Sequence, residues 1–346
     1  MLKELSSADP GPMARGGEPS TLYLGGGTPS LLPPQAIATL LRELHGGSTY
    51  PGATPRGSRT DPEVTLEANP EDVTPDAARA WHAAGINRVS LGAQSFDDKV
   101  LEWMHRSHDA ARIGAAVHAL RGAGIDNISL DLIFGLPEEL KRNWERDLDM
   151  LCSLLPAHCS LYGLTVEPRT PLDRWISRGA THAPDEERYA EEYLLAHERL
   201  SVFGYQFYEV SNASLPGFRS QHNSAYWSGR PYVGLGPAAH SFDGTTRRWN
   251  LRAWEAYRRA IAEGRSAIES EEMLTAEQRE MEAMYLGLRT VEGLAFTALR
   301  RPTPPPHLAA QGWVVAADGR LKCTPEGWLR LDSLVNELAM HTEIPQ

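Results

Sequence analysis

Strand-like and helical segments alternate along the first half of the chain, and this alternation limits the possible folds more than any other feature. The strand-like runs cover residues 21–24, 64–68, 88–92, 128–133 and 161–166, and each is bounded by Gly, Pro or Asn. Helical patterns at 33–44, 75–84, 110–123 and 144–155 separate them, with Thr74 and Asp109 as expected N-caps. This order predicts an α/β fold with parallel strands joined by crossover helices. We expect the strands to be apolar over most of their length, because helices cover them.

Polar residues and glycines follow four consecutive strands of this pattern. The first strand runs into Gly25-Gly26-Gly27-Thr28-Pro29, which matches neither a dinucleotide-binding fingerprint nor a phosphate-binding P-loop. The corresponding residues are Glu67 with Asn69-Pro70 at the second strand, Gln94 with Ser95 after the third, and Asp131 with Gly135-Leu136-Pro137 at the fourth. Parallel strands place their ligand sites at their carboxyl ends, so these residues predict a single shared pocket.

The pattern changes after residue 166. A long amphipathic helix at 185–202 precedes a strand at 207–210, and a segment dense in Gly, aromatic and polar residues follows. The tail is helical from about residue 274 and ends in a short strand, a turn and a helix capped near Thr324. We therefore expect an unpacked start at 1–20, a barrel at 21–205, a covering segment at 206–270 and a small helix-rich, winged-helix-like unit at 271–346. Loops are expected at 46–62 and 302–306.

Composition narrows the class of protein. The 346-residue chain carries a formal charge of -11, which argues against a nucleic-acid-binding protein. It has no apolar run of membrane-spanning length and no secretory signal, so we expect a cytoplasmic protein without a transmembrane segment. Cys152, Cys159 and Cys323 are the only cysteines, and their spacing favours neither a disulfide framework nor a self-contained zinc site.

The ordered motifs resemble one family. The succession of the glycine loop, Glu67-Ala-Asn-Pro, Gly92-Ala-Gln-Ser, Arg106 within "HRSH" and "DLIFGLP" is similar to the coproporphyrinogen III oxidase-like group of radical S-adenosylmethionine (SAM) proteins, the HemN/HemW family. The resemblance implies a partial (β/α)6 barrel, open on one side, with a C-terminal domain. It further implies that SAM contacts seven residues: Gly26, Gly27, Thr28, Glu67, Gln94, Arg106 and Asp131. Without the family pattern, Asp131 could equally cap a loop and Arg106 could be a solvated helix residue.

A second motif points to one branch of this family. "HNSAYW", residues 222–227, resembles the H-N-x-x-Y-W motif of the HemW branch, whose members are haem chaperones. The resemblance implies that His222, Asn223, Tyr226 and Trp227 contact haem, with His222 as the ligand of the iron. Two alternatives remain open, since the aromatic residues could pack on the barrel or His240 could be the ligand. The arginines that could pair with the propionates are Arg219, Arg230, Arg247 and Arg248.

One expected motif is missing from the sequence. Family members begin with a strand carrying C-x-x-x-C-x-x-C, which holds a [4Fe-4S] cluster, and this chain has no such motif. We expect that the first β/α unit of the barrel is absent, and that Cys152 and Cys159 are buried core residues, whereas Cys323 lies nearer the surface. A start assigned too late, a truncated gene and a homologue that has lost radical chemistry all explain this. An unpaired barrel edge favours aggregation, so we predict that the in-frame DNA upstream encodes the cysteine motif.

Two functions follow from the resemblance. The first is a haem chaperone that binds haem and SAM and delivers haem to an apoprotein. The second is an oxygen-independent coproporphyrinogen III oxidase that acts on the propionates of its substrate, with an electron donor for the cluster. The barrel motifs are common to both branches, so only residues 222–227 separate the two.

Overall fold

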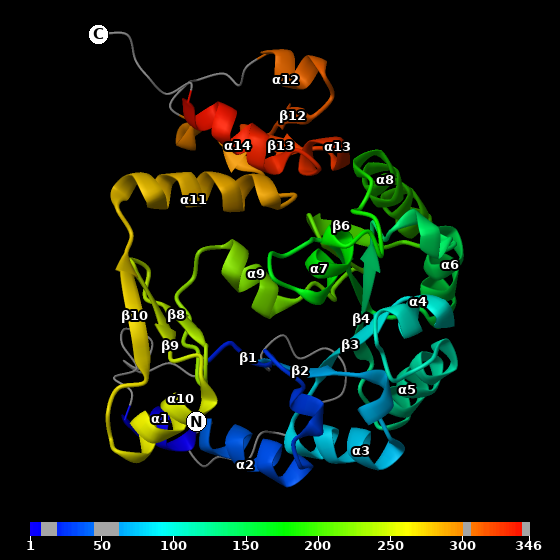
Figure 1. Cartoon of the computed structure of the whole chain (residues 1–346). Helices are drawn as coiled ribbons and strands as arrows, with labels where there is room; N and C mark the ends of the chain where they lie inside the picture. Colours follow the sequence, from blue (N-terminus) through cyan, green and yellow to red (C-terminus); the bar gives the residue numbers. More distant parts are fainter. Residues whose placement is uncertain (8–18, 45–61, 300–305, 341–346) are drawn as a thin grey trace.

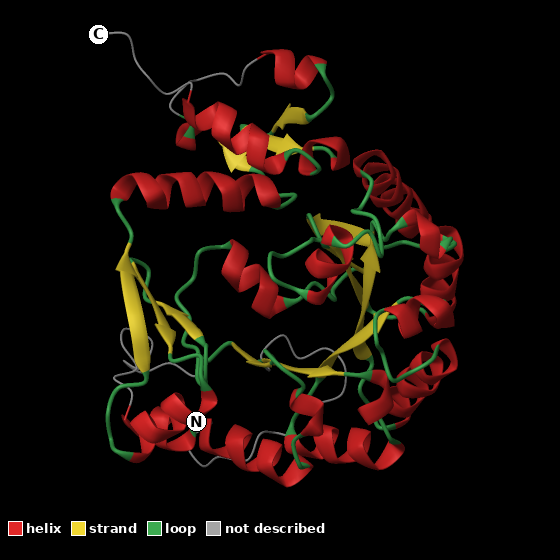
Figure 2. Ribbon diagram, viewed as in Figure 1, coloured by secondary structure: helices red, strands yellow, loops and turns green. Residues whose placement is uncertain are grey.

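The computed structural model describes residues 1–7, 19–44, 62–299 and 306–340 (Figure 1). The expected loops at 46–61 and 302–305, and most of the expected unpacked start, lie outside these ranges. Within them, the main sheet is curved and helices cover its outer side, so it forms part of a barrel (Figure 2).

The main sheet has seven strands in the order β1-β2-β3-β4-β5-β7-β6. The strands are β1 (Thr21–Leu24), β2 (Glu63–Ala68), β3 (Arg88–Gln94), β4 (Asn127–Phe134), β5 (His158–Gly163), β6 (Gln206–Glu209) and β7 (Asn212–Ser214). The first five pair in parallel, which confirms the direction predicted from the alternation of strands and helices. β7 was not predicted. It is antiparallel to both β5 and β6, because only two residues connect it to β6.

The strands are not apolar over most of their length, and here the sequence-based expectation was wrong. Side chains alternate between two faces, and the residues on one of these faces are mostly polar. One row of facing partners across five strands is polar and consists of Glu67, Ser90, Ser129, His158 and Ser214. The neighbouring row is apolar and fully buried, and consists of Leu91, Leu130, Cys159 and Ala213. The apolar face packs against the outer helices, and the polar face is turned to the inner side of the curved sheet.

The outer helices begin and end close to their predicted positions. They are α2 (Pro34–Leu44), α3 (Pro75–Ala84), α5 (Ala110–Gly122), α6 (Trp144–Leu154) and α8 (Glu186–Val202). Thr74 and Asp109 are N-caps as predicted, since their side chains accept hydrogen bonds from the amides of Ala77 and Arg112. Two short helices, α4 (Asp98–Trp103) and α7 (Pro171–Ser177), follow the ends of β3 and β5.

The bounds of β5 differ from the prediction by three residues. The strand begins at His158 because His158 and Ser160 are buried on the polar face and are hydrogen-bonded there. It ends at Gly163, where the ring of Tyr189 packs against the backbone and leaves no room for a Cβ. An apolar pattern alone placed the strand too late, since polar residues that are satisfied inside a barrel do not look like strand residues.

A small antiparallel sheet lies beside the opening of the barrel (Figure 1). It has the order β10-β9-β8 and contains β8 (His240–Phe242), β9 (Thr246–Asn250) and β10 (Ile268–Met273). Helix α9 (Gln221–Trp227) leads into it, and α10 (Trp254–Ala262) connects β9 to β10. The first helix, α1 (Leu2–Ser7), is tied to this part by the buried Glu4, which accepts hydrogen bonds from the Gly236 amide and the Tyr257 hydroxyl.

The C-terminal elements have a hydrophobic core of their own, which includes Met284, Leu308 and Leu334. They are α11 (Ala276–Arg289), β11 (Leu294–Ala295), α12 (Pro306–Ala310), β12 (Val314–Ala317), β13 (Arg320–Cys323), α13 (Pro325–Trp328) and α14 (Leu331–Met340). The helix capped near Thr324 was predicted, and the three-stranded sheet β11-β13-β12 goes beyond the single short strand expected there. The division at residues 205 and 270 stays a prediction. Among the described helices, none combines the length and the apolar character needed to cross a membrane.

Candidate functional site

The glycine loop after β1 is held by a carboxylate from the next strand. Glu67, near the end of β2, accepts a hydrogen bond from the Gly26 amide at 3.1 Å and one from the Tyr23 hydroxyl at 2.6 Å. Burial raises the pKa of Tyr23, and the adjacent Glu67 raises it further, so the phenol stays protonated and donates to the carboxylate. The loop and the second strand end are therefore brought together as the sequence predicted, and Tyr23 is an additional member of the site.

The three glycines have different surroundings. A Cβ on Gly25 would lie 2.5 Å from the ring of Tyr23 and 2.8 Å from the Glu67 carboxyl group, so this position is closed to any side chain. Gly26, with φ of +83°, and Gly27 have no atom within 4 Å of an added Cβ. The backbone of Gly26 and Gly27 is therefore open to a ligand, whereas Gly25 is required by the packing beneath it. Thr28 follows as a half-buried residue before a short 3-10 helix.

Asp131 of β4 lies on the polar face and is surrounded by serine hydroxyls. Ser90 donates to its carboxylate at 2.9 Å and Ser129 donates at 3.0 Å. Burial raises the pKa of Asp131 to about 6, the serine hydrogen bonds oppose the shift, and the nearby charge of Glu67 adds to it. Ser129 also contacts His158 at 2.8 Å, and His158 contacts the Tyr208 hydroxyl at 2.9 Å. Asp131 thus ends a chain of buried hydrogen bonds.

Gln94 and Arg106 are the other two side chains expected in this site. Gln94 is buried at a register shift in β3, with φ of +66°, and its side-chain amide lies over Gly92. Arg106 follows α4, is half-buried, and its guanidinium has no hydrogen bond or ion pair within the described ranges. Glu67 contacts Gly26 and faces Ser90, which donates to Asp131, so three of the predicted positions lie close together. Among the described residues, no hydrogen bond or ion pair joins Arg106 to them.

His222 lies in the first turn of α9 and is fixed from several sides. Its Nδ1 is 2.9 Å from the Thr21 hydroxyl, and its Nε2 is 3.2 Å from the Tyr226 hydroxyl. The ring stacks on Tyr23 with a centroid distance of 4.8 Å. Burial lowers the pKa of His222, with an opposing contribution from Glu63, so the imidazole is neutral near pH 7.

Glu63, the first residue of β2, holds the beginning of α9. Its buried carboxylate accepts hydrogen bonds from the Ser220 hydroxyl at 3.1 Å and from the Gln221 and His222 amides at 3.0 Å each. A carboxylate at a helix N-terminus satisfies amides that have no partner within the helix and interacts favourably with its dipole. Glu63 therefore sets the position of His222 relative to the barrel.

The other residues of the 222–227 motif are spread around α9. The backbone N–H of Asn223 donates to the Ser220 hydroxyl. Tyr226 packs edge-on against Tyr232, with a distance of 4.7 Å between the ring centroids. Trp227 points to the C-terminal elements instead, because the guanidinium of Arg289 lies 4.1 Å from its ring centroid. One face of Trp227 is thus covered by a cation of α11.

The alternative haem contacts lie at separate places. His240 is exposed on β8 and stacks on Trp249 with a centroid distance of 6.1 Å. Three of the four arginines considered for the propionates already form ion pairs, Arg219 with Glu292, Arg247 with Glu282, and Arg248 with Asp243 and Glu271. Arg230 is exposed, and no ion pair involves it within the described ranges.

Tyr23 connects the two groups of predicted residues. Its hydroxyl is bound to Glu67, next to the glycine loop, while its ring stacks on His222. Sequence reasoning missed Tyr23, Thr21 and Glu63, although all three lie on the polar face of their strands. The alternation of polar and apolar residues in "TLYL" and "EVTLEA" was the signal that could have identified them.

Comparisons with known proteins identify the family of this chain. The model of the Radical SAM superfamily matches residues 12–151. The chain is 36% identical over 325 residues to "Heme chaperone HemW" of Mycobacterium tuberculosis (strain ATCC 25618 / H37Rv). The aligned region covers 92% of this chain and 80% of the relative. This chain belongs to the HemW family of the radical SAM superfamily. "Heme chaperone HemW" of Escherichia coli (strain K12) is 33% identical over 335 residues, covering 93% of this chain and 84% of that protein.

The chain is also similar to a mitochondrial protein, and it shares its fold with a solved structure. "Radical S-adenosyl methionine domain-containing protein 1, mitochondrial" of Bos taurus is 32% identical over 340 residues, covering 92% of this chain and 75% of the relative. The structure described as "Coproporphyrinogen III oxidase (HemN) from Escherichia coli is a Radical SAM enzyme" has a TM-score of 0.74 at 22% identity. It covers 93% of this chain and 78% of that one, so the α/β fold is a radical SAM partial barrel with additional C-terminal elements.

The cysteines of this HemW-family chain do not fit an iron–sulfur cluster. Cys152 in α6 and Cys159 in β5 are buried in the barrel core as predicted, and Cys323 lies on β13. Burial raises the pKa of all three thiols, that of Cys323 to about 12. Within the described ranges, no three His, Cys, Asp or Glu side chains are grouped to hold a metal ion.

Proposed function

We propose that this chain binds haem as a cargo at α9, with His222 as the ligand of the iron, and binds SAM at the glycine loop. The observation that carries the proposal is the environment of His222. A neutral imidazole whose Nδ1 is bound to the Thr21 hydroxyl can leave the lone pair of Nε2 for a metal. The name "heme chaperone" of relatives that are 33–36% identical supports the same function.

The Tyr226 hydroxyl is part of this proposed haem site. It lies 3.2 Å from Nε2 of His222, the nitrogen that would bind iron. Haem binding therefore requires the hydroxyl to move away, while the ring of Tyr226 remains beside Tyr232. Tyr226 acts as a competitor for the imidazole in the unloaded protein and as an aromatic neighbour of the porphyrin in the loaded one.

The residues at the glycine loop fit SAM. SAM supplies a sulfonium cation, a methionyl amino and carboxylate group, and ribose hydroxyls. The open backbone at Gly26 and Gly27 would accept the amino group, Thr28 would lie beside it, and Gln94 can both donate and accept. Glu67 and Asp131 would accept hydrogen bonds from hydroxyls or balance the sulfonium charge, and Arg106 would bind the carboxylate.

The proposal assigns no step to an iron–sulfur cluster, because the cysteines of this chain do not fit one. It favours a chaperone over the oxidase, since the named relatives at 33–36% identity are chaperones whereas the likeness to HemN at 22% identity concerns the fold alone. An apoprotein that receives haem, and an electron donor for a cluster, stay predictions from the sequence.

A haem titration followed by Soret absorbance tests the haem site. His222→Ala is compared with His240→Ala, which removes the alternative histidine on β8. We expect His222→Ala to lose the shifted Soret band of an imidazole-bound haem and His240→Ala to keep it. Unchanged spectra for His222→Ala would contradict the assignment, and no binding by the wild type would contradict haem binding itself. Glu67→Gln and a SAM titration by calorimetry test the second site independently.

A further inference from the structure

A small cluster of side chains holds the segment that contains Arg106. Glu71 lies in the short 3-10 helix that follows β2, and its carboxylate accepts hydrogen bonds from the Ser107 hydroxyl and from Nδ1 of His108, the latter at 3.0 Å. The side chain of His108 is fully buried, and its Nε2 lies 3.3 Å from the Ala93 carbonyl of β3. We call Glu71, Ser107 and His108 the 71–108 latch. It joins the segment after α4 to the ends of β2 and β3.

Both partners of the His108 ring are hydrogen-bond acceptors. A ring nitrogen donates only when it carries a proton, so the ring satisfies both contacts when both of its nitrogens are protonated. Burial acts to raise the pKa of Glu71, but the hydrogen bonds from Ser107 and His108 outweigh burial and hold the pKa below its usual value, so Glu71 is ionised near pH 7. With a protonated ring the latch contains charge-assisted hydrogen bonds, which are about twice as strong as neutral ones.

The 71–108 latch lies beside two of the positions expected to contact SAM. Arg106 is two residues before His108, and its own amide donates to a carbonyl of α4 at 2.9 Å, so the backbone of Arg106 is anchored on both sides. The Ala93 carbonyl, which faces His108, also accepts from the Ser95 amide at 2.8 Å and closes the bend in which Gln94 has a φ of +66°. The ring of His108 therefore connects the backbone beside Gln94 to the backbone beside Arg106.

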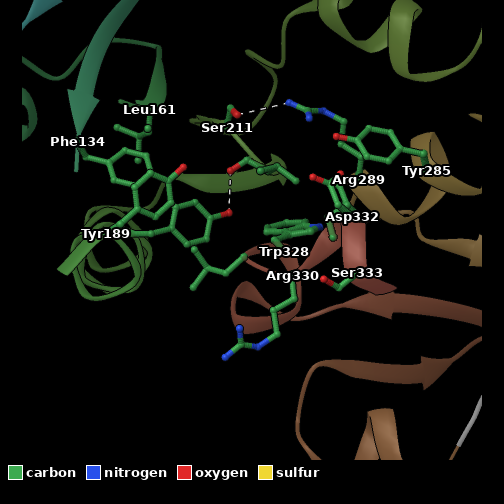
Figure 3. A pocket seen from close by; sticks show the side chains of 15 residues that line it. Phe134, Leu161, Tyr189, Ser211, Tyr285, Arg289, Trp328, Arg330, Asp332 and Ser333 are labelled. Atoms are coloured by element: carbon green, nitrogen blue, oxygen red, sulfur yellow. Dashed lines mark hydrogen bonds between the residues drawn. The ribbon is translucent and has the colours of Figure 1, made fainter. Parts of the chain in front are cut away.

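The guanidinium of Arg106 is available to a ligand, whereas that of Arg289 is not. Arg289, beside the cavity between the barrel and the C-terminal elements, donates to the Ser211 hydroxyl at 3.4 Å (Figure 3). It also pairs with the buried Glu209 at 2.7 Å. Arg106 is half-buried, and its guanidinium has no hydrogen bond or ion pair among the described residues. A long side chain on a fixed backbone loses less entropy when it binds than one on a mobile loop, so the latch prepares Arg106 for a ligand.

We propose that Glu71 and His108 are positioning residues for SAM, because they hold Arg106 where its guanidinium can meet the methionyl carboxylate. Their role rests on the proposed SAM site. The side chain of His108 is fully buried and cannot touch a ligand itself, so it acts through the segments that it joins. That segment, residues 104–109 between α4 and α5, has no regular secondary structure of its own to fix Arg106.

The first test compares SAM with decarboxylated SAM, which keeps the sulfonium, the amino group and the ribose but has no carboxylate. Glu71→Gln keeps the shape of the side chain and replaces one acceptor oxygen with a donor, so the latch loses a hydrogen bond. In calorimetric titrations we expect this variant to bind SAM about two- to tenfold more weakly and to bind the analogue as the wild type does. A general electrostatic effect has the opposite pattern, because the analogue is more cationic and loses more when an anion is removed. That pattern would overturn the proposal.

A double-mutant cycle with Arg106→Ala tests whether the latch acts through this arginine. In the Arg106→Ala background, Glu71→Gln should cause no further loss of SAM affinity. The same loss in both backgrounds would overturn the proposal. Glu139→Gln is the matched control, because Glu139 likewise accepts from a hydroxyl and a histidine ring, those of Thr181 and His182, but joins segments without a residue predicted for SAM. It should leave the affinity for SAM unchanged.

Two milder variants keep the proposal testable if Glu71→Gln does not fold. Ser107→Ala removes only the hydroxyl of an exposed residue. His108→Asn keeps a donor at the position of Nδ1, toward Glu71, but loses the contact with Ala93. Both should weaken SAM and spare the analogue. Equal SAM affinity in the wild type and all latch variants would overturn this role and leave the SAM site standing, whereas no SAM binding by the wild type would overturn both.

Discussion

Removing the Tyr226 hydroxyl should strengthen haem binding. Tyr226→Phe keeps the ring, and with it the edge-on contact to Tyr232, but it releases Nε2 of His222 from its hydrogen bond of 3.2 Å. A typical net hydrogen bond contributes about 0.5–1.5 kcal/mol, and this contribution is lost from the unloaded state alone. The haem dissociation constant should therefore fall by about two- to tenfold.

The measurement is a Soret titration of Tyr226→Phe against Tyr232→Phe, which removes a neighbouring hydroxyl that contacts neither nitrogen of His222. We expect only the first variant to bind more tightly, with a spectrum that still depends on His222. Weaker or unchanged binding by Tyr226→Phe would refute the idea that this hydroxyl competes with iron. An equal gain in both variants would show that general loosening of the aromatic cluster is the cause.

Three further predictions concern the supports of the site. Glu63→Ala removes three hydrogen bonds to a charged acceptor, each typically contributing about 1.5–3 kcal/mol. We expect α9 to become less ordered and the haem affinity to fall, with a smaller loss for Glu63→Gln. Unchanged Soret titrations would contradict this. The pKa of Asp131 is raised to about 6, so its ionised form should accept a hydrogen bond from SAM only above that pH. Calorimetry should show that the affinity for SAM falls as pH drops through 6. Asp131→Asn should not show this pH dependence. For folding, the pH dependence runs the other way. The folded state favours the protonated carboxyl of Asp131, so this group stabilises the fold at low pH, and the stabilisation is lost as pH rises through 6. Arg289→Met leaves the buried Glu209 without its partner at 2.7 Å and should cost about 3–5 kcal/mol in urea unfolding, part of which adding Glu209→Gln should restore.

The sequence predicted the elements well where local chemistry determines them. Thr74 and Asp109 mark helix starts because a side-chain oxygen before an apolar run can accept from a free amide. The parallel direction of β1 to β5 followed from the helix between each pair of strands. β7 was missed because it has three residues, and its pairing with β5 is decided by contacts more than fifty residues apart.

The candidate site was predictable only in part, for a similar reason. Glu67 stands next to the end of β2, a position that the sequence pattern identifies, whereas Asp131 lies in the middle of β4. The support of His222 comes from Thr21 and Glu63, which are 201 and 159 residues away in the chain. No local pattern joins such distant residues, and only the curvature of the sheet brings β1 and β2 beside α9. The same holds for Arg289 and Trp227, whose contact links two parts that the sequence treated separately.

The position of β1 in the sheet has a consequence for local stability. β1 has four residues and, in the described part of the chain, pairs with a strand on one side only. Edge strands open more readily than central ones, so β1 should exchange its amide hydrogens faster than β3 or β4. Yet this strand carries the glycine loop, Thr21 and Tyr23. The contacts of both proposed ligand sites therefore rest on an edge strand of the sheet, and each bound ligand would act as a clamp on it.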